Sequence, residues 1–186
     1  PPAVVEALRS RAAHPVYGYA STPESFWQAA MEWLRRRHGW TIERRWLARS
    51  PGVVPALSLC VNAFTAPGDA VIVQPPVYYP FFWAVENNGR RLVRNPLVLE
   101  NGRFRMDLDD LEARIDGCTR MLILCSPHNP VGRVWRRGEL ERLGEVCERH
   151  DLVVLSDEIH MDLVLPEYRH VPFASISPAL AARTIT

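Results

Sequence analysis

Four short segments of this 186-residue sequence carry residues that could bind a small, flat, anionic ligand. The first is the turn at Gly52, Val53 and Val54, which precedes an apolar helical pattern. The first turn of a helix has backbone N–H groups without partners and a positive dipole end, and these features together favour a phosphate. Many strand-to-helix turns have this composition without binding anything, so the turn alone indicates only a possible phosphate site.

The second and third segments supply an aromatic ring and a carboxamide. Tyr78 and Tyr79 follow two prolines that hold an extended loop. One of these rings could stack on a heteroaromatic ligand, or both could pack in the core near a helix start. Asn129 stands between Pro127 and Pro130, which restrict its direction. It could donate a hydrogen bond to a phenolate-like oxygen, although asparagine is also a common turn residue.

The fourth segment begins at Asp157, which ends the apolar run 152–157 and is followed by Glu158, Ile159 and His160. A carboxylate at the end of a buried strand is costly unless it has a cationic or hydrogen-bonded partner. A protonated pyridine nitrogen would be such a partner. His160 could contact the same ligand, or it could be a packed histidine at the strand end.

These segments need elements that bring them to one edge of a sheet. Short β-rich runs alternate with helical patterns, which predicts an α/β fold with a doubly wound, mostly parallel sheet. The expected strands are 46–50, 70–74, 90–94, 121–126 and 152–157. The expected helices begin near Gly52, Tyr79, Asp107, Gly138 and Phe173. Ligands of such sheets bind at the carboxyl ends of the strands, where all four segments would lie.

A further helix is expected ahead of the sheet. Thr22 is its predicted N-cap, Pro23 would be its first residue, and the pattern ends before Gly39. Its apolar face is predicted from spacings of four, seven and eight residues, at Phe26, Ala30, Trp33 and Leu34.

Composition narrows the classes of function. A net charge of +1 provides no broad field for nucleic acid or an anionic membrane, and no apolar run approaches the ~18 residues of a membrane span. The four cysteines are widely spaced and have no histidines at zinc-ligand spacing, so we expect buried, reduced thiols and no metal site. A cytoplasmic protein that acts on a small molecule is the expectation.

In their order along the chain, SPGVV, QPPVYYPF, CSPHNPVG and SDEIH resemble the fold-type I pyridoxal-phosphate (PLP) enzymes of the class I/II aminotransferase superfamily. The resemblance covers essentially the whole chain and is greatest to the cystathionine β-lyase group of carbon–sulfur lyases. It implies PLP as the cofactor, with its phosphate on the turn at 52–54 and its ring against Tyr78. Asn129 would bind the ring oxygen O3′, and Asp157 would keep the ring nitrogen protonated.

The resemblance also suggests the reaction. Many aminotransferases of this fold have a tyrosine three residues after the aspartate, where this sequence has His160. The DEIH and SPHNPVG forms favour β-elimination from a cysteine-type amino acid, giving a thiol, pyruvate and ammonia, over transamination. Tyr17 and Tyr19 resemble a stretch that reaches the neighbouring subunit's cofactor, which implies a homodimer with a shared active site. Alternatively, these tyrosines simply pack near a helix.

The sequence contains no lysine, and all 22 of its basic residues are arginine. In the family, a lysine both anchors the cofactor and moves the substrate's α-proton. We therefore expect residues 1–186 to be an N-terminal portion of the large PLP-binding domain, without the lysine segment and the C-terminal small domain. The alternatives are an aminotransferase and a lysine-free, noncatalytic PLP-binding protein. A nucleotide-binding domain is disfavoured because no GxGxxG or GxxxxGK[ST] run is present.

Overall fold

A five-stranded parallel sheet forms the centre of the molecule, in a computed structural model that describes residues 1–186. The strand order is β2-β1-β5-β6-β7, and all four neighbouring pairs are parallel. The strands are β1 (Ala70–Val73), β2 (Arg91–Arg94), β5 (Thr119–Cys125), β6 (Val153–Asp157) and β7 (Thr184–Ile185). The predicted doubly wound α/β fold is confirmed.

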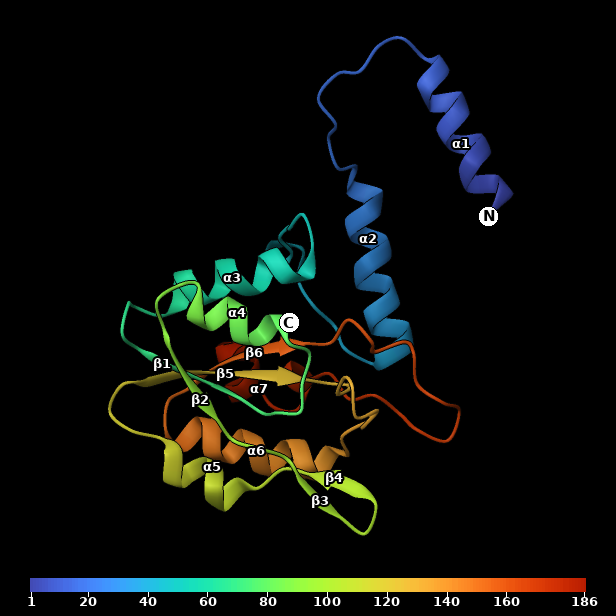
Figure 1. The fold of residues 1–186 in the computed structure, drawn as a ribbon. Helices are drawn as coiled ribbons and strands as arrows, with labels where there is room; N and C mark the ends of the chain where they lie inside the picture. The colour runs from blue at the N-terminus through green and yellow to red at the C-terminus, as the bar shows by residue number, and fades with distance from the viewer.

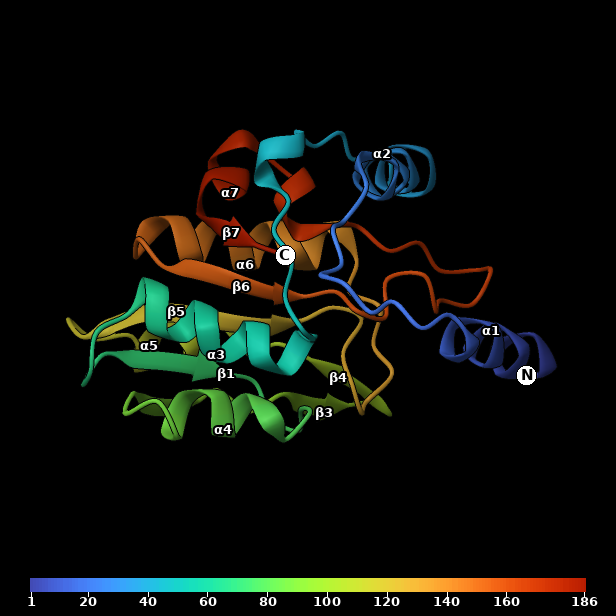
Figure 2. The same ribbon diagram turned by 90° about the horizontal axis from the view of Figure 1, so that it is seen from above.

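Helices cover both faces of this sheet (Figures 1 and 2). One face carries α3 (Val53–Phe64) and α4 (Pro80–Glu86). The other carries α5 (Leu108–Arg114), α6 (Arg137–Arg149) and α7 (Pro178–Arg183), with a 3-10 turn at Phe173–Ser175 before α7. A small antiparallel hairpin of β3 (Val98–Glu100) and β4 (Arg103–Arg105) precedes α5, and the sequence analysis did not predict it.

The alternation of side chains along β5 divides the core into two clusters. Leu122 and Leu124 belong to the cluster under α5 and α6, whereas Met121 and Ile123 belong to the cluster under α3 and α4. All four side chains are almost completely buried. A strand that is covered on both faces needs a continuous apolar run, which explains why β5 was recognisable from its sequence.

The N-terminal segment stands apart from the sheet (Figure 1). Helix α1 (Pro2–Ala13) has no buried residue. Helix α2 (Glu24–Trp33) continues into a π-helical turn at Leu34–His38 and ends at Gly39, whose positive φ of 66° suits glycine. The predicted end of this helix is therefore confirmed.

Two predictions for α2 were wrong. Pro23, in an extended conformation, is the N-cap, whereas the Thr22 hydroxyl accepts a hydrogen bond from Arg49. The predicted apolar face is also displaced, because Trp27 is the buried residue of α2 while Phe26 and Trp33 are exposed. The guanidinium of Arg44 lies 4.1 Å from the centre of the Trp27 ring, which fixes Trp27 as the residue that faces the rest of the molecule.

The predicted strand at 46–50 is absent. Its place is taken by a 3-10 turn at Arg44–Trp46 and an extended connection that pairs with no strand. Arg44 and Arg49 direct their side chains to Trp27 and Thr22. The segment therefore packs along α2 and not at the edge of the sheet.

The cysteines are free, as expected, and two of them, Cys125 and Cys147, are buried. Cys60 is partly buried, but Cys118 is exposed, contrary to the prediction of buried thiols. The structure contains no group of three or more side chains that could hold a metal ion. No helix combines the length and hydropathy that a membrane span requires.

Candidate cofactor site

The ends of β5 and β6 bring Asn129 and Asp157 to the same edge of the sheet. Cys125, the last residue of β5, pairs in register with Asp157, the last residue of β6. The Ser126 amide then donates to the Asp157 carbonyl oxygen at 3.0 Å. Strands β5 and β6 both end at this point, so the loop that contains Asn129 starts beside Asp157.

Asp157 is buried and forms no ion pair. Its Oδ1 accepts a hydrogen bond from the Ile159 amide at 3.1 Å, and its other oxygen accepts none from the protein. Burial raises the pKa of Asp157, the Ile159 amide and His160 oppose that shift, and the neighbouring Glu158 adds to it. A buried carboxyl with a free oxygen and no ion pair is suited to a ligand that provides a positively charged N–H group.

Asn129 is held by its backbone and keeps its side chain free. Its carbonyl oxygen accepts from the Tyr78 amide at 3.0 Å, and its own amide donates to Cys125 Sγ at 3.3 Å. The carboxamide makes no hydrogen bond within the protein, so it can bind a ligand. These bonds also fix the distance between the two loops that carry Tyr78 and Asn129.

His128 reinforces the same connection, and the sequence analysis assigned it no role. Its Nε2 lies 3.0 Å from the Pro76 carbonyl oxygen, and its ring meets Trp135 edge-on at 5.5 Å. Burial lowers the pKa of His128 to about 4, so the ring is neutral and Nε2–H donates to Pro76. Only its position in SPHNPVG, beside Asn129, could have suggested this function.

The two tyrosines after the second proline pair differ in their surroundings. Tyr79 packs against Trp83 with ring centres 4.6 Å apart, as a surface aromatic of α4. Tyr78 touches Tyr79 and Phe81 but remains 36% exposed. Because the Tyr78 amide donates to the Asn129 carbonyl oxygen, Tyr78, and not the more exposed Tyr79, is the partly exposed ring attached to the Asn129 loop.

The turn before α3 presents two unpaired backbone donors. Gly52 is the N-cap, and its carbonyl oxygen accepts from the Ser50 hydroxyl at 2.8 Å and from the Ala56 amide at 3.1 Å. The amides of Val53 and Val54 have no acceptor in the protein, and Pro55 has no N–H. The first turn of α3 therefore offers two backbone N–H groups to an anion.

A pocket of about 270 Å³ joins Asn129 to His160. Its walls come from the loop after β5 and the segment after β6, with Pro127, His128, Pro130, Gly132, Val134, Leu163, Val164, Leu165 and Tyr168 as the other lining residues. His160 and Asn129 therefore line the same pocket.

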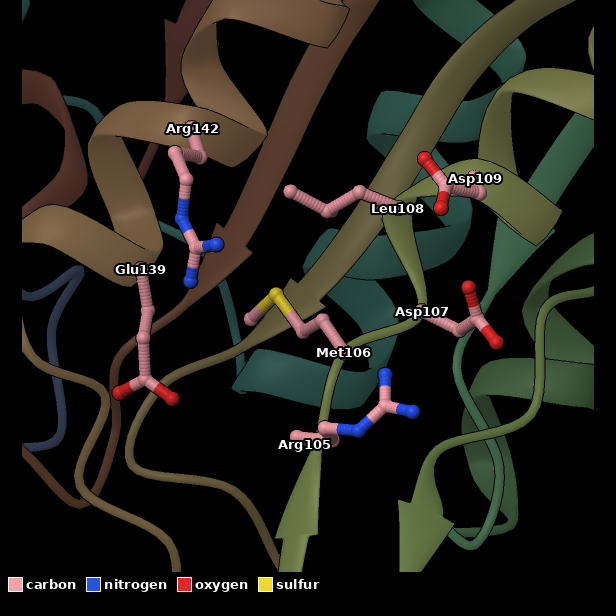
Figure 3. Close-up of a pocket in the computed structure, with 7 residues that line it drawn as sticks. All are labelled: Arg105, Met106, Asp107, Leu108, Asp109, Glu139 and Arg142. Carbon is pink, nitrogen blue, oxygen red and sulfur yellow. The ribbon is translucent and has the colours of Figure 1, made fainter.

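Two other features lie outside this site. A pocket of about 200 Å³ between β4, α5 and α6 is lined mainly by charged side chains, and Figure 3 shows them on different walls. Among them, Glu139 already accepts from Arg133 and from the Arg136 amide. Tyr17 and Tyr19 lie between α1 and α2, where Tyr17 bonds to the Ala12 carbonyl oxygen and Tyr19 is fully exposed. Neither tyrosine reaches the strand ends within this chain.

Comparison with known proteins identifies the family. Residues 1–185 match the family model of aminotransferase class I and II. The chain belongs to this family. It is 46% identical over 187 residues to the cystathionine beta-lyase PatB of Bacillus subtilis, covering 100% of the chain and 48% of PatB. It is 34% identical to the protein MalY of Escherichia coli, covering 95% of the chain and 46% of MalY.

Solved structures give the same result. A PLP-bound putative aminotransferase from Clostridium difficile matches with a TM-score of 0.92 and 44% identity, covering 99% of this chain and 48% of that one. Cystalysin from Treponema denticola, which contains PLP, matches with a TM-score of 0.91 and 40% identity, covering 99% and 47%. The chain thus spans about half the length of these relatives. Its family is PLP-dependent, and PLP is its cofactor.

The free polar groups of the site fit this cofactor. The two amides of α3 suit a phosphate, the partly exposed ring of Tyr78 suits a flat ring, and the Asn129 carboxamide suits a ring oxygen. The buried carboxyl of Asp157 lacks the cation that a pyridinium nitrogen would supply.

Proposed function

We propose that residues 1–186 form the cofactor-binding portion of a PLP-dependent carbon–sulfur β-lyase that acts on a cysteine-type amino acid. The histidine at position 160 carries this proposal, because many aminotransferases of this fold have a tyrosine there. His160 lines one pocket with Asn129. Similarity to PatB, which is named a cystathionine beta-lyase, supports it.

Each site residue has a proposed role. The Val53 and Val54 amides bind the phosphate, Tyr78 stacks on the ring, and Asn129 donates to O3′, with His160 at the same oxygen. Asp157 holds the proton on the ring nitrogen. When bound, PLP supplies an electron sink for negative charge at the substrate's α-carbon, and the charge on Asp157 maintains that property.

The covalent anchor is proposed to lie outside this sequence, because residues 1–186 include no lysine. We propose that the same lysine would also be the base for the α-proton. The arginine for the substrate carboxylate would lie in a C-terminal small domain. This assignment agrees with the match to about half of each relative.

The function is tested with the full-length gene product and L-cystathionine. We expect pyruvate and a thiol to be released without any added keto acid, because loss of the thiol leaves an enamine that tautomerises to an imine, and water hydrolyses this imine to pyruvate and ammonia. Pyruvate is measured with lactate dehydrogenase and thiol with a disulfide reagent. Efficient transfer of the amino group to a keto acid, with no pyruvate, would instead establish an aminotransferase, the activity named for a 37% identical relative, the arginine–pyruvate transaminase AruH of Pseudomonas aeruginosa.

Reduction with borohydride tests the alternative that the protein binds PLP without a lysine and has no activity. Peptide mapping of the reduced full-length product should place a pyridoxyl group on a lysine outside residues 1–186. A product with tightly bound PLP but neither an adduct nor elimination would support the noncatalytic alternative and contradict the proposed lyase.

We further propose a homodimer in which the N-terminal segment reaches the partner's site. Helix α1 buries none of its residues and exposes Val4, Val5 and Leu8, and Tyr19 is fully exposed. Such apolar exposure is typical of a contact surface. Deleting residues 1–20 should convert the dimer to monomer in sedimentation experiments, whereas Leu99→Ala, an exposed change on the hairpin, should not. A monomeric wild type, or a deletion variant that remains dimeric, would contradict this proposal.

A further inference from the structure

A carboxyl and an imidazole are buried together directly after Asp157. The Glu158 side chain is 0% exposed and that of His170 is 1% exposed, with 2.6 Å between Oε2 and Nε2. The other oxygen of Glu158 accepts from the Ser156 hydroxyl at 2.7 Å and from the Phe173 amide at 2.9 Å. Three hydrogen-bond donors therefore converge on this one carboxyl.

An ionised Glu158 creates a difficulty for Asp157. Two buried carboxyls in adjacent residues compete for ionisation, and the charge of Glu158 raises the pKa of Asp157 beyond the effect of burial. No arginine forms an ion pair with either of them. His170 is therefore the one basic side chain that contacts the Glu158 carboxylate.

We propose that His170 is an imidazolium that neutralises Glu158, so that Asp157 alone carries the negative charge at the end of β6. The charges of Glu158 and His170 would cancel each other, so the negative charge near the ring nitrogen of PLP would come from Asp157. The protonated ring nitrogen requires that charge. His170 touches neither cofactor nor substrate in this arrangement, so it is a positioning residue that acts through Asp157.

His38 completes the surroundings of His170. The two rings meet edge to face, with centres 5.6 Å apart and planes at 87°. His38 Nε2 lies 2.9 Å from Asp162 Oδ1, and Asp162 also accepts from Trp33 Nε1 at 2.8 Å and lies 3.8 Å from Arg37 Nε.

Two imidazolium rings in contact would repel each other, so one of the two histidines carries the proton. Asp162 is 39% exposed and is stabilised by water, whereas the Glu158 carboxyl has no access to water. A proton on His170 is therefore stabilised more by Glu158 than a proton on His38 is by Asp162.

Nitrogen NMR tests the proposal directly. In the full-length protein labelled with ¹⁵N-histidine, both ring nitrogens of His170 should have imidazolium shifts at pH 7.5. The signals are assigned with single glutamine substitutions at each of the six histidines. Glu158→Gln should make His170 neutral at that pH, while His38→Gln should leave it charged. A neutral His170 in the wild type overturns the proposal, and of the variants only His170→Gln has to fold for this signal to be assigned.

Cofactor affinity provides a second readout, which rests on the proposed role of Asp157. His170→Gln should raise the Kd of PLP by up to about tenfold towards low pH, corresponding to a shift of about one pKa unit at Asp157. The difference from wild type should shrink as the pH rises, because Asp157 then ionises in the variant as well. Tryptophan fluorescence quenching measures this affinity.

The double variant Glu158→Gln/His170→Gln removes both charges and should restore an affinity close to that of the wild type. A merely structural role would give a loss that is independent of pH and is not rescued. If His170 is an imidazolium but the affinity does not respond, the proposed contact of Asp157 with PLP fails. If His170 is neutral, the ion pair itself fails.

Discussion

Asp157→Asn is expected to lower the elimination activity of the full-length protein about a thousandfold, or about 4 kcal/mol in the activation barrier. Asparagine has nearly the same shape, but it cannot hold a proton on the ring nitrogen through a negative charge. The ring then withdraws electrons poorly when the α-proton leaves. Steady-state pyruvate release measures the effect.

The matched control is Asp151→Asn. The Asp151 side chain is 96% exposed and pairs only with Arg183 at the surface, so its removal should leave activity unchanged within about twofold. If Asp157→Asn retained a tenth or more of wild-type activity, the assignment of Asp157 to the ring nitrogen would be wrong.

Asp157→Asn lowers the expected activity, but it should not lower the stability of the cofactor-free protein. Burial raises the pKa of Asp157, so the folded state favours the protonated form and loses that advantage as the pH rises through the raised pKa. At neutral pH the ionised carboxyl therefore costs folding free energy, and asparagine removes this cost. Thermal unfolding should find the cofactor-free variant at least as stable as wild type, but less stabilised by added PLP.

The sequence predicted those parts of the fold in which the pattern of apolar residues matches the pattern of buried residues. Strand β5 is covered on both faces, so its apolar run was continuous, and the loop after it carried Asn129 in a restricted turn. The same logic located Asp157, because a carboxyl that ends such a run needs a partner. The pairing of Cys125 with Asp157 then places both residues at one edge.

The sequence failed where a long-range contact decides the local structure. The run at 46–50 has the composition of a strand, but Arg44 and Arg49 bind Trp27 and Thr22 and hold it away from the sheet. Trp27 became the buried residue of α2 through the same arginine. Neither contact leaves a periodic signal, because Arg44 lies 17 residues from Trp27 and Arg49 lies 27 residues from Thr22 in the chain.

The support behind the site was equally hidden. His128 and His170 join segments distant in sequence, through Pro76 in one case and Glu158 in the other. A histidine pattern does not reveal its carbonyl or carboxyl partner, so only the structure identifies which loops they hold together.

Val53→Pro is expected to weaken PLP binding about ten- to hundredfold without unfolding α3. Val53 is the first residue of this helix, where proline is favoured and its missing N–H breaks no bond within the helix. Gly52 before it is extended, with φ of 171° and ψ of 168°, a conformation that a following proline tolerates.

The substitution therefore removes one of two phosphate donors and little else. A hydrogen bond to a charged group contributes about 1.5–3 kcal/mol, which gives the expected range of affinity. Val53→Ala is the matched control, because it shortens the same side chain but keeps the amide. The Kd of PLP from fluorescence titration, and circular dichroism of both variants, test the prediction. Equal affinity of the two variants would show that the phosphate is not bound at the start of α3, because the backbone N–H at Val53 is the donor that only one of them lacks.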